Sequence, residues 1–316
     1  MEQLCISFEK HFTTNITEIN LNYIIIIALV FLNIYAFKEN LKIHDIIFIE
    51  VNMNSIERTL KYVDLYLVNN DLNNIPDYKL PDGYRFVFFN DGDEKDWVNI
   101  EMSSGEFLSY DEGIEAFKHY YGEHYEELKR LCLFIENEQG EKVATSTAFY
   151  LEEPINDITG NVHWVSVKKE YQGKHLSKPL ISETLKQMAM LGHKKTLLHT
   201  QTHTWLAVKV YLDMGFDPYE MEKKYLGWQI VKKLTNHSKL ASVSDIDESE
   251  MYNHLYVQAY EFLKSKYEEP FNYKVWDEKG PIIGINANGQ VYYYKYTFES
   301  GELKIVGENN EYRKIL

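Results

Sequence analysis

Cysteine is nearly absent from this chain of 316 residues. The only two cysteines, Cys5 and Cys132, lie far apart in the sequence and form no Cys-x-x-Cys pair. The sequence therefore provides neither a disulfide framework nor a cysteine-based metal site. Cys132 lies in an apolar run and is predicted to be a buried thiol. This cysteine usage favours a reducing compartment, and we expect the cytoplasm.

Basic residues are scarce relative to acidic ones. The chain has 33 Lys and Arg against 48 Asp and Glu, which gives a formal net charge of −15. Binding to a phosphate backbone needs clustered basic side chains, so this balance argues against a nucleic-acid partner. An acidic surface keeps a protein soluble, and it also favours a cationic small molecule as a partner.

Residues 1–52 contain no Gly, no Pro and no Arg. Their most apolar stretch, Leu21–Phe37, is slightly shorter than the roughly 20 residues of a membrane span, and two Asn residues interrupt it. Three interpretations stay open. The segment is a single membrane anchor with the rest of the chain in the cytoplasm, or an apolar element docked on the fold. In the third interpretation it is not normally translated, because it corresponds to AT-rich DNA ahead of a true start codon at Met53.

A strand, a loop and the beginning of a helix follow one another in residues 165–179. Val165 and Val167 alternate with a polar residue, which is typical of a strand. Gly173 interrupts the strand, and apolar residues recur at helical spacing from Leu176 onward. The first turn of a helix has unpaired backbone N–H groups and a partial positive charge. This arrangement predicts a site for a phosphate or pyrophosphate.

Residues 167–177 resemble the acyl-CoA-binding motif of the GCN5-related N-acetyltransferases, whose form is V-x-P-x-x-[RQ]-G-x-G-x-[GA]. Gln172 and Gly173 match this motif. His175 stands at the second Gly of the motif, and Ser177 stands at its final Gly or Ala. We expect the small Ser177 to be tolerated, whereas His175 either crowds the pyrophosphate or contacts it through its imidazole.

Two more stretches resemble the same family, in the order that the family requires. Lys195–Gln201 reads as a buried strand, and the following helix ends in Val210–Phe216, which is similar to the family's L-Y-x-x-x-G-F. Thr204 stands where the family usually has Asn. Upstream, Val143–Phe149 resembles the strand that precedes the CoA-binding strand. The resemblance covers about residues 62–234, more than half of the chain.

The predicted fold class is α/β, a three-layer mixed sheet with helices on both faces, plus a small C-terminal α+β domain. Strands of the larger sheet are expected at Tyr84–Phe89, Leu131–Ile135, Lys142–Tyr150, Val162–Val167, Lys195–Gln201 and Lys224–Lys233. Helices are expected at residues 91–106, 111–130 and 202–215, and from Leu176 onward.

The predicted domains are an N-terminal extension (1–52), a GNAT-like acetyltransferase domain (53–234), a polar linker (235–250) and the small α+β domain (251–316). In this last domain, a helix from Tyr252 is followed by four short strands. These strands are expected at Phe271–Trp276, Ile282–Asn286, Val291–Phe298 and Leu303–Val306.

The resemblance implies an acyl-CoA-dependent N-acyltransferase that transfers acetyl from acetyl-CoA to a small-molecule or peptide amine, by direct attack and without a metal. It also implies that the pantetheine arm pairs with one strand and that the following loop holds the pyrophosphate. The implied acyl-CoA-binding residues are Val165, Val167, Gln172, Gly173, Lys174, His175, Leu176, Ser177 and Thr204. The alternative is a non-catalytic acyl-CoA-binding sensor or scaffold, in which His175 has damaged the loop.

Tyr211 is the predicted general acid, because the pKa of a phenol, about 10, lies near that of a thiol. It also matches the Tyr position of the family. His163 is predicted to share a strand face with Val165 and to act as the base, with a purely structural role left open. Glu101 and Glu106 are alternatives that would bind a cationic acceptor, but we interpret both as solvated surface carboxylates.

Four histidines could suggest a metal site, but none of them forms a motif such as HExxH, because His199 and His203 have its spacing with Thr200 at the Glu position. We therefore expect no metal site. The four are His163, His175, His199 and His203.

Overall fold

The computed structural model describes residues 56–277 and 280–308, all of which lie in one compact unit, residues 54–316. The predictions for residues 1–52, including the candidate span Leu21–Phe37, fall outside the described residues. Of the helices that the structure describes, none is both long and apolar enough to cross a bilayer.

The larger sheet has seven strands in the order β2-β3-β4-β5-β6-β1-β7. All neighbouring strands are antiparallel except β5 and β6, which are parallel. The strands are β1 (Asp64–Asn69), β2 (Tyr84–Phe88), β3 (Cys132–Asn137), β4 (Lys142–Ile155), β5 (Ile158–Val167), β6 (Thr196–Gln201) and β7 (Asp217–Tyr219).

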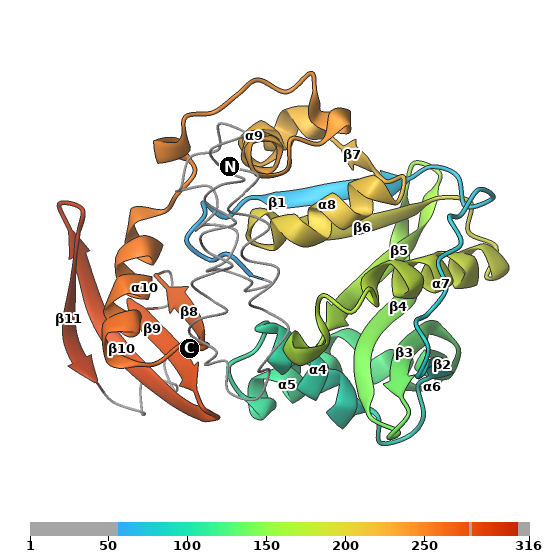
Figure 1. Ribbon diagram of the computed structural model, residues 1–316, viewed down its shortest axis with the longest axis horizontal. Coiled ribbons are helices and arrows are strands. Elements are labelled where there is room, and N and C mark those ends of the chain that lie inside the picture. The colour runs from blue at the N-terminus through green and yellow to red at the C-terminus, as the bar shows by residue number, and fades with distance from the viewer. Residues whose placement is uncertain (1–55, 278–279, 309–316) are drawn as a thin grey trace, which may run out of the picture. The chain divides into compact units, whose positions relative to one another are not determined.

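Helices pack against both faces of this sheet (Figure 1). The helices α4 (Glu94–Ser104), α5 (Tyr110–Tyr121) and α6 (Tyr125–Leu131) bury aromatic and aliphatic side chains against one face. The opposite face is covered by α7 (Ser177–Met190), α8 (Trp205–Asp213) and α9 (Tyr225–Thr235). Successive residues of β4 point to opposite faces of the sheet. Ala148 packs on the face covered by α7, α8 and α9, and Phe149 packs on the face covered by α4, α5 and α6. The predicted α/β layers are confirmed.

The prediction of a final strand at Lys224–Lys233 is wrong, because this segment is the helix α9. Its β-branched Ile230 and Val231 are typical of a strand, but Trp228 and Val231, three residues apart, are buried in the same cluster against β1 and β6. The strand that pairs with β6 is instead β1, which precedes the first predicted strand in the sequence. The helix spacing decides the structure here because it places one continuous apolar face on the sheet.

Gly227 allows α9 to lie close to the segment that enters β1. A Cβ atom at this position would come within 2.8 Å of Leu65 Cδ2 and 2.9 Å of Val63 Cγ1. We expect Gly227→Ala to lower the free energy of unfolding by about 1–3 kcal/mol, as overpacking does. The matched control is Gly122→Ala, because a Cβ at Gly122 meets nothing within 4 Å. Urea denaturation of both variants tests this, and equal stabilities would contradict it.

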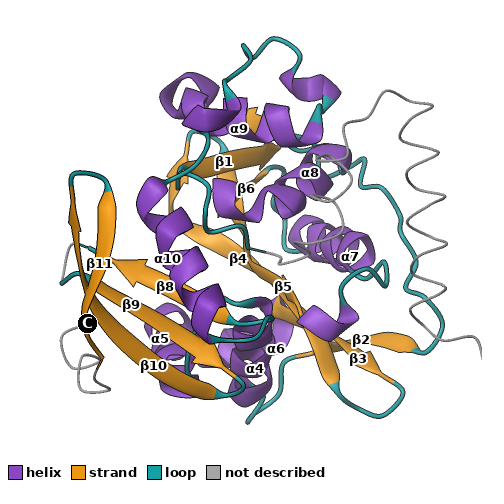
Figure 2. Ribbon diagram, turned by 60° about the vertical axis from the view of Figure 1, so that its left-hand side comes forward, coloured by secondary structure: helices purple, strands orange, loops and turns teal. Residues whose placement is uncertain are grey.

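The C-terminal sheet has four antiparallel strands in the order β11-β10-β9-β8, and α10 (His254–Lys266) packs on it (Figure 2). Its strands are β8 (Asn272–Trp276), β9 (Ile282–Ala287), β10 (Gln290–Glu299) and β11 (Glu302–Glu308). The predicted separate C-terminal α+β element is confirmed. The segment predicted as a polar linker is packed, since Leu240 and Val243 are buried in the core of the larger sheet.

Candidate active site

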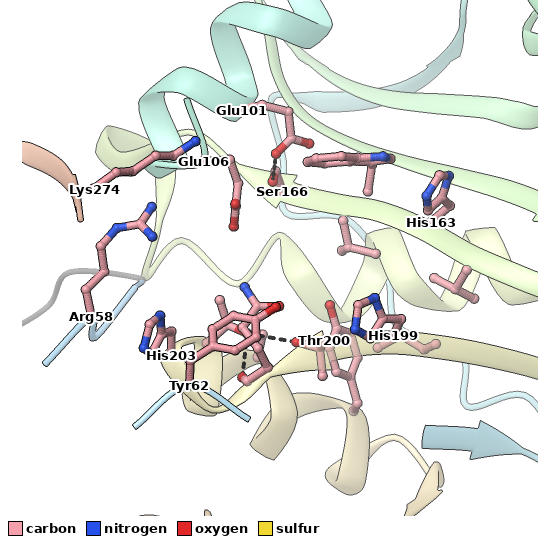
Figure 3. A pocket seen from close by; sticks show the side chains of 18 of the residues that line it. Arg58, Tyr62, Glu101, Glu106, His163, Ser166, His199, Thr200, His203 and Lys274 are labelled. Atoms are coloured by element: carbon pink, nitrogen blue, oxygen red, sulfur yellow. Dashed lines mark hydrogen bonds between the residues drawn. The ribbon is translucent and has the colours of Figure 1, made fainter. Parts of the chain in front are cut away.

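The site lies where two parallel strands separate. β5 and β6 pair only from Gly160–Val162 to Thr196–Leu198. Beyond Val162 the strands part, and a cavity of about 500 Å³ opens between them (Figure 3). Residues 161–166 of β5 and 198–201 of β6 line it, together with side chains from α4, α5 and α8. A backbone edge without a strand partner is a place where a ligand can add hydrogen bonds.

A β-bulge at Trp164 re-aims the side chains of β5. Trp164 has a φ of 50°, and the pairing register with β4 shifts between Thr145 and Thr147. Both Trp164 and His163 therefore contact aromatic residues of α5, whereas Val165 packs on the opposite face with α7 and α8. The predicted common face of His163 and Val165 is wrong, because the extra residue of a bulge breaks strand alternation.

His163 is largely enclosed by aromatic rings. Its Nδ1 lies 3.1 Å from the Tyr121 hydroxyl. Burial lowers the pKa of His163 to about 4, and the nearby His199 adds to this effect. The imidazole is therefore neutral at neutral pH and has little tendency to take a proton from an ammonium group.

Glu101 is a functional candidate, and its prediction as a solvated surface carboxylate is wrong. It lies in the last turn of α4, and its side chain is fully buried rather than solvated. Ser166 Oγ donates a hydrogen bond of 2.6 Å to Oε2, whereas Oε1 has no hydrogen-bond partner in the described structure. Burial raises the pKa of Glu101 to about 8, with a further contribution from Glu106, although the Ser166 hydrogen bond opposes the shift.

The signal for this burial was present in the sequence. Glu101 follows Trp97 by four residues and Val98 by three, so it lies on the apolar face of the helix. Both of these residues are fully buried. A carboxyl group on an apolar face, with one oxygen unpaired and a raised pKa, is typical of a functional site. Glu106 also lines the cavity.

Tyr211 comes from α8 and lines the same cavity as Glu101. Burial raises the pKa of the Tyr211 phenol, and the charge of Glu101 adds to the effect. The phenol is therefore protonated at any ordinary pH. Thr204 precedes α8 and also lines the cavity, where its Oγ1 lies 2.8 Å from Thr200 Oγ1.

The predicted pyrophosphate loop is an exposed segment between β5 and α7. Gln172 Nε2 donates to the Val167 carbonyl at 3.1 Å and so ties the loop to the end of β5. No side chain caps the first turn of α7 in the described structure, and this turn contains no acidic residue. Its free N–H groups suit an anion. Of the predicted binding residues, Val165 and Thr204 line the cavity, whereas the loop residues do not.

His175 adopts the left-handed conformation that the second Gly of the motif would adopt without strain. Its φ is +60°, and its side chain is exposed. We expect His175→Gly to raise the free energy of unfolding by up to about 1 kcal/mol. The left-handed conformation costs an L-residue about 1–2 kcal/mol, and the greater entropy of the unfolded chain with Gly offsets part of this gain. Lys174→Gly, in the same loop at negative φ, is the control and should be destabilising. Chemical denaturation that finds both variants destabilised would contradict this expectation.

Residues at one end of the cavity come from parts of the chain where the sequence indicated no site. Arg58 and Tyr62 precede β1, Tyr256 belongs to α10, and β8 contributes Lys274 and Trp276. No motif marks these residues, since they meet only through the packing of the C-terminal sheet. In the part of the chain that the structure describes, no group of three or more His, Cys, Asp or Glu side chains could hold a metal ion.

Solved structures of other proteins align with about half of this chain. None of the curated proteins matches the chain. The GCN5-related N-acetyltransferase from Sphaerobacter thermophilus aligns at 17% identity with a TM-score of 0.42, over 51% of this chain and 50% of that one. An acetyltransferase of the GNAT family from Colwellia psychrerythraea aligns at 15% identity with a TM-score of 0.39, over 52% of this chain and 55% of that one.

The match to these solved structures thus spans about half of each chain. The family model described as Acetyltransferase (GNAT) family matches residues 95–216, from α4 to the residue just before β7. This segment holds Glu101, the separating strands, the loop before α7, and Tyr211. Residues 95–216 of this chain belong to the acetyltransferase (GNAT) family.

Proposed function

We propose that the chain is an acyl-CoA-dependent N-acyltransferase that transfers acetyl from acetyl-CoA to a primary amine by direct attack. The observation that carries this proposal is a buried carboxyl group with a raised pKa and a buried phenol in one cavity, where β5 and β6 separate. An amine acetyltransferase needs a base for the ammonium proton and a donor for the departing thiolate.

The described residues offer a place for the pantetheine arm of the acyl donor and another for its pyrophosphate. The β6-facing edge of β5 beyond Val162 has no strand partner in the described structure, so it is available to the pantetheine arm. In the described structure, the first turn of α7, which no side chain caps, and the exposed loop before it are available to the pyrophosphate. The two regions are joined by the hydrogen bond from Gln172 to the Val167 carbonyl.

In the proposed reaction, Glu101 as a carboxylate takes a proton from the acceptor ammonium. The neutral amine nitrogen then attacks the thioester carbon, so a C–N bond forms and the C–S bond breaks. Tyr211 donates its phenolic proton to the leaving sulfur, which takes the electron pair of the broken C–S bond, so CoA departs as the thiol. The attacking nitrogen loses its second proton to solvent as the amide forms, solvent returns a proton to Tyr211, and no acyl-enzyme forms. His163, with its low pKa, holds Tyr121 rather than carrying the proton.

The test is to incubate the full chain with acetyl-CoA and a panel of primary amines. Thiol release and the mass of the acetylated amine would both be followed, with calorimetric titration of acetyl-CoA as the binding control. Saturable binding with amine-dependent product is the expected result. Saturable binding without any product would instead favour the non-catalytic acyl-CoA-binding module, and it would overturn the proposal.

A further inference from the structure

One end of the cavity has its own set of charges. We define this acceptor end by six side chains that line the cavity: Arg58, Tyr62, Glu106, Tyr256, Lys274 and Trp276. Five of these lie outside the segment 95–216 that matches the family model. We infer that the amine acceptor also carries a carboxylate, which Arg58 binds, and that the C-terminal sheet closes the cavity around this amino acid. This inference rests on the proposed function.

Arg58 brings a positive charge that no acidic side chain in the described structure neutralises. Among residues 56–277 and 280–308, its one hydrogen bond, 2.8 Å from Nη2, goes to the carbonyl of Gly105. Lys274 differs, because it is paired with Glu112. The planar guanidinium offers further N–H groups in a fork that matches both oxygens of a carboxylate. An incoming carboxylate would therefore pair with a charge that has no acidic partner among the described side chains.

A role in capping α4 does not account for Arg58. This helix already ends with Gly105 in the left-handed conformation, and backbone N–H groups bond to the carbonyls of Glu101 and Met102. The Met102 carbonyl also accepts from Asn272 Nδ2 at 3.1 Å. The end of the helix thus has its caps without Arg58.

The positively charged and the acidic side chains of the cavity lie apart, in an arrangement that suits a zwitterionic ligand. Figure 3 shows Arg58 and Lys274 on one side of Glu106, and Glu101 with Ser166 on the other. An ammonium group placed by the two glutamates leaves a carboxylate of the same molecule for Arg58. A polyamine would instead bring a second positive charge toward Arg58 and Lys274, and like charges repel.

The C-terminal sheet is a fixed wall of this end. Asn286 Nδ2 donates to the Leu108 carbonyl at 2.6 Å, and Lys274 pairs with Glu112 of α5. The wall is aromatic, since Trp276 and Tyr256 both line it, and the Tyr256 hydroxyl donates to the Val275 carbonyl at 3.1 Å. The cavity of about 500 Å³ must also hold the acetyl group, so the geometry favours a free amino acid over a protein side chain.

The test compares amines that differ by one carboxylate: phenylalanine with phenethylamine, and lysine with cadaverine. For the full chain, we expect kcat/KM to favour the amino acid of at least one pair by about 10- to 100-fold, which is the usual effect of a charged hydrogen-bonded contact. Arg58→Met should reduce this ratio to about one, mainly through KM. Arg58→Lys should retain part of it, because the charge remains.

Arg130→Met is the matched control, because Arg130 is exposed on α6 and does not line the cavity; it should keep the full preference. A wild-type protein that prefers the decarboxylated amine in both pairs, or an Arg58→Met variant that keeps the preference, would overturn the inference. Calorimetric binding of each amino acid in the presence of CoA separates this inference from the proposed function. If binding depends on Arg58 and no transfer occurs, only the proposed reaction fails; if binding of neither amino acid depends on Arg58, the inference fails.

Discussion

Replacing Glu101 by Gln is expected to lower kcat for amine acetylation by about 10²- to 10⁴-fold, the usual contribution of a general base. The amide keeps the shape of the side chain and can still accept the hydrogen bond that Ser166 Oγ donates to Glu101. It cannot take a proton from an ammonium group. Steady-state release of the CoA thiol measures the effect, with acetyl-CoA binding followed by calorimetry in the same preparations.

The pH dependence should identify Glu101 as the base. Because burial raises its pKa to about 8, the carboxylate is the minor form below that pH. For the wild type, kcat/KM should rise about tenfold for each pH unit below 8 and then level. The variant should lack this limb. The control is Glu115→Gln, because Glu115 is exposed on α5, and its profile should match that of the wild type.

The same substitution should make the protein more stable. The carboxyl group titrates at an ordinary value of 4.5 when unfolded and at about 8 when folded. Below 4.5 both states hold the proton, and between these values only the unfolded state releases it, so stability falls as pH rises. Gln removes this loss. We expect Glu101→Gln to gain up to about 3 kcal/mol of unfolding free energy at pH 7, and nothing at pH 4.

A gain in stability with a loss of activity would mark a group that is kept for function. If Glu101→Gln destabilises the protein at pH 7 as much as at pH 4, the pKa of the Glu101 carboxyl group is not raised in the folded state. Its assignment as the base then fails. Urea denaturation at the two pH values decides between these results.

Tyr211→Phe is expected to lower kcat by about 10²-fold or more, at the lower end of the range for a general acid. The ordinary pKa of a phenol, about 10, lies near that of a thiol, and burial raises the pKa of Tyr211 above that value. The match survives because the thiolate leaves in the same cavity, where desolvation disfavours its charge as well. The phenol therefore remains a suitable proton donor to the sulfur.

Removing one hydroxyl should leave the packing of Tyr211 against Phe216 in place, so the variant should bind acetyl-CoA. Tyr110→Phe, at an exposed position of α5, is the matched control and should turn over normally. An unchanged kcat in Tyr211→Phe would refute the role of general acid. Recovery of the rate with an acyl donor whose thiol has a low pKa would support the role, because a better leaving group needs less protonation.

The segments with a strong local pattern were predictable. The C-terminal strands follow turn signals and alternate in polarity, and β5, the loop and α7 follow from Gly173 and the helical spacing after Leu176. β1 and α9 were not predictable in the same way. β1 is short and pairs with strands more than 120 residues away in the sequence, and α9 contains residues with strand propensity that tertiary packing overrides.

The site was predictable only in part. The positions of Val165, Thr204 and Tyr211 along the cavity follow from the motifs. The bulge at Trp164 has no sequence signature. Because of it, the side chain of His163 lies on the face of β5 opposite to that of Val165, and not on the same face as predicted. Arg58 and Lys274 meet only in the folded chain, because the C-terminal sheet packs against the end of α4 and the loop after it.

The most direct test of Glu101 as the base of an acetyltransferase is the rate of acetyl transfer from acetyl-CoA to an amine at pH 6, 7 and 8, in the wild type and in Glu101→Gln. We expect a wild-type kcat/KM that rises about tenfold for each pH unit, and a variant that binds acetyl-CoA but transfers at least about 100-fold more slowly at pH 8. A wild-type protein that binds acetyl-CoA and acetylates no amine, or a variant as fast as the wild type, would contradict it.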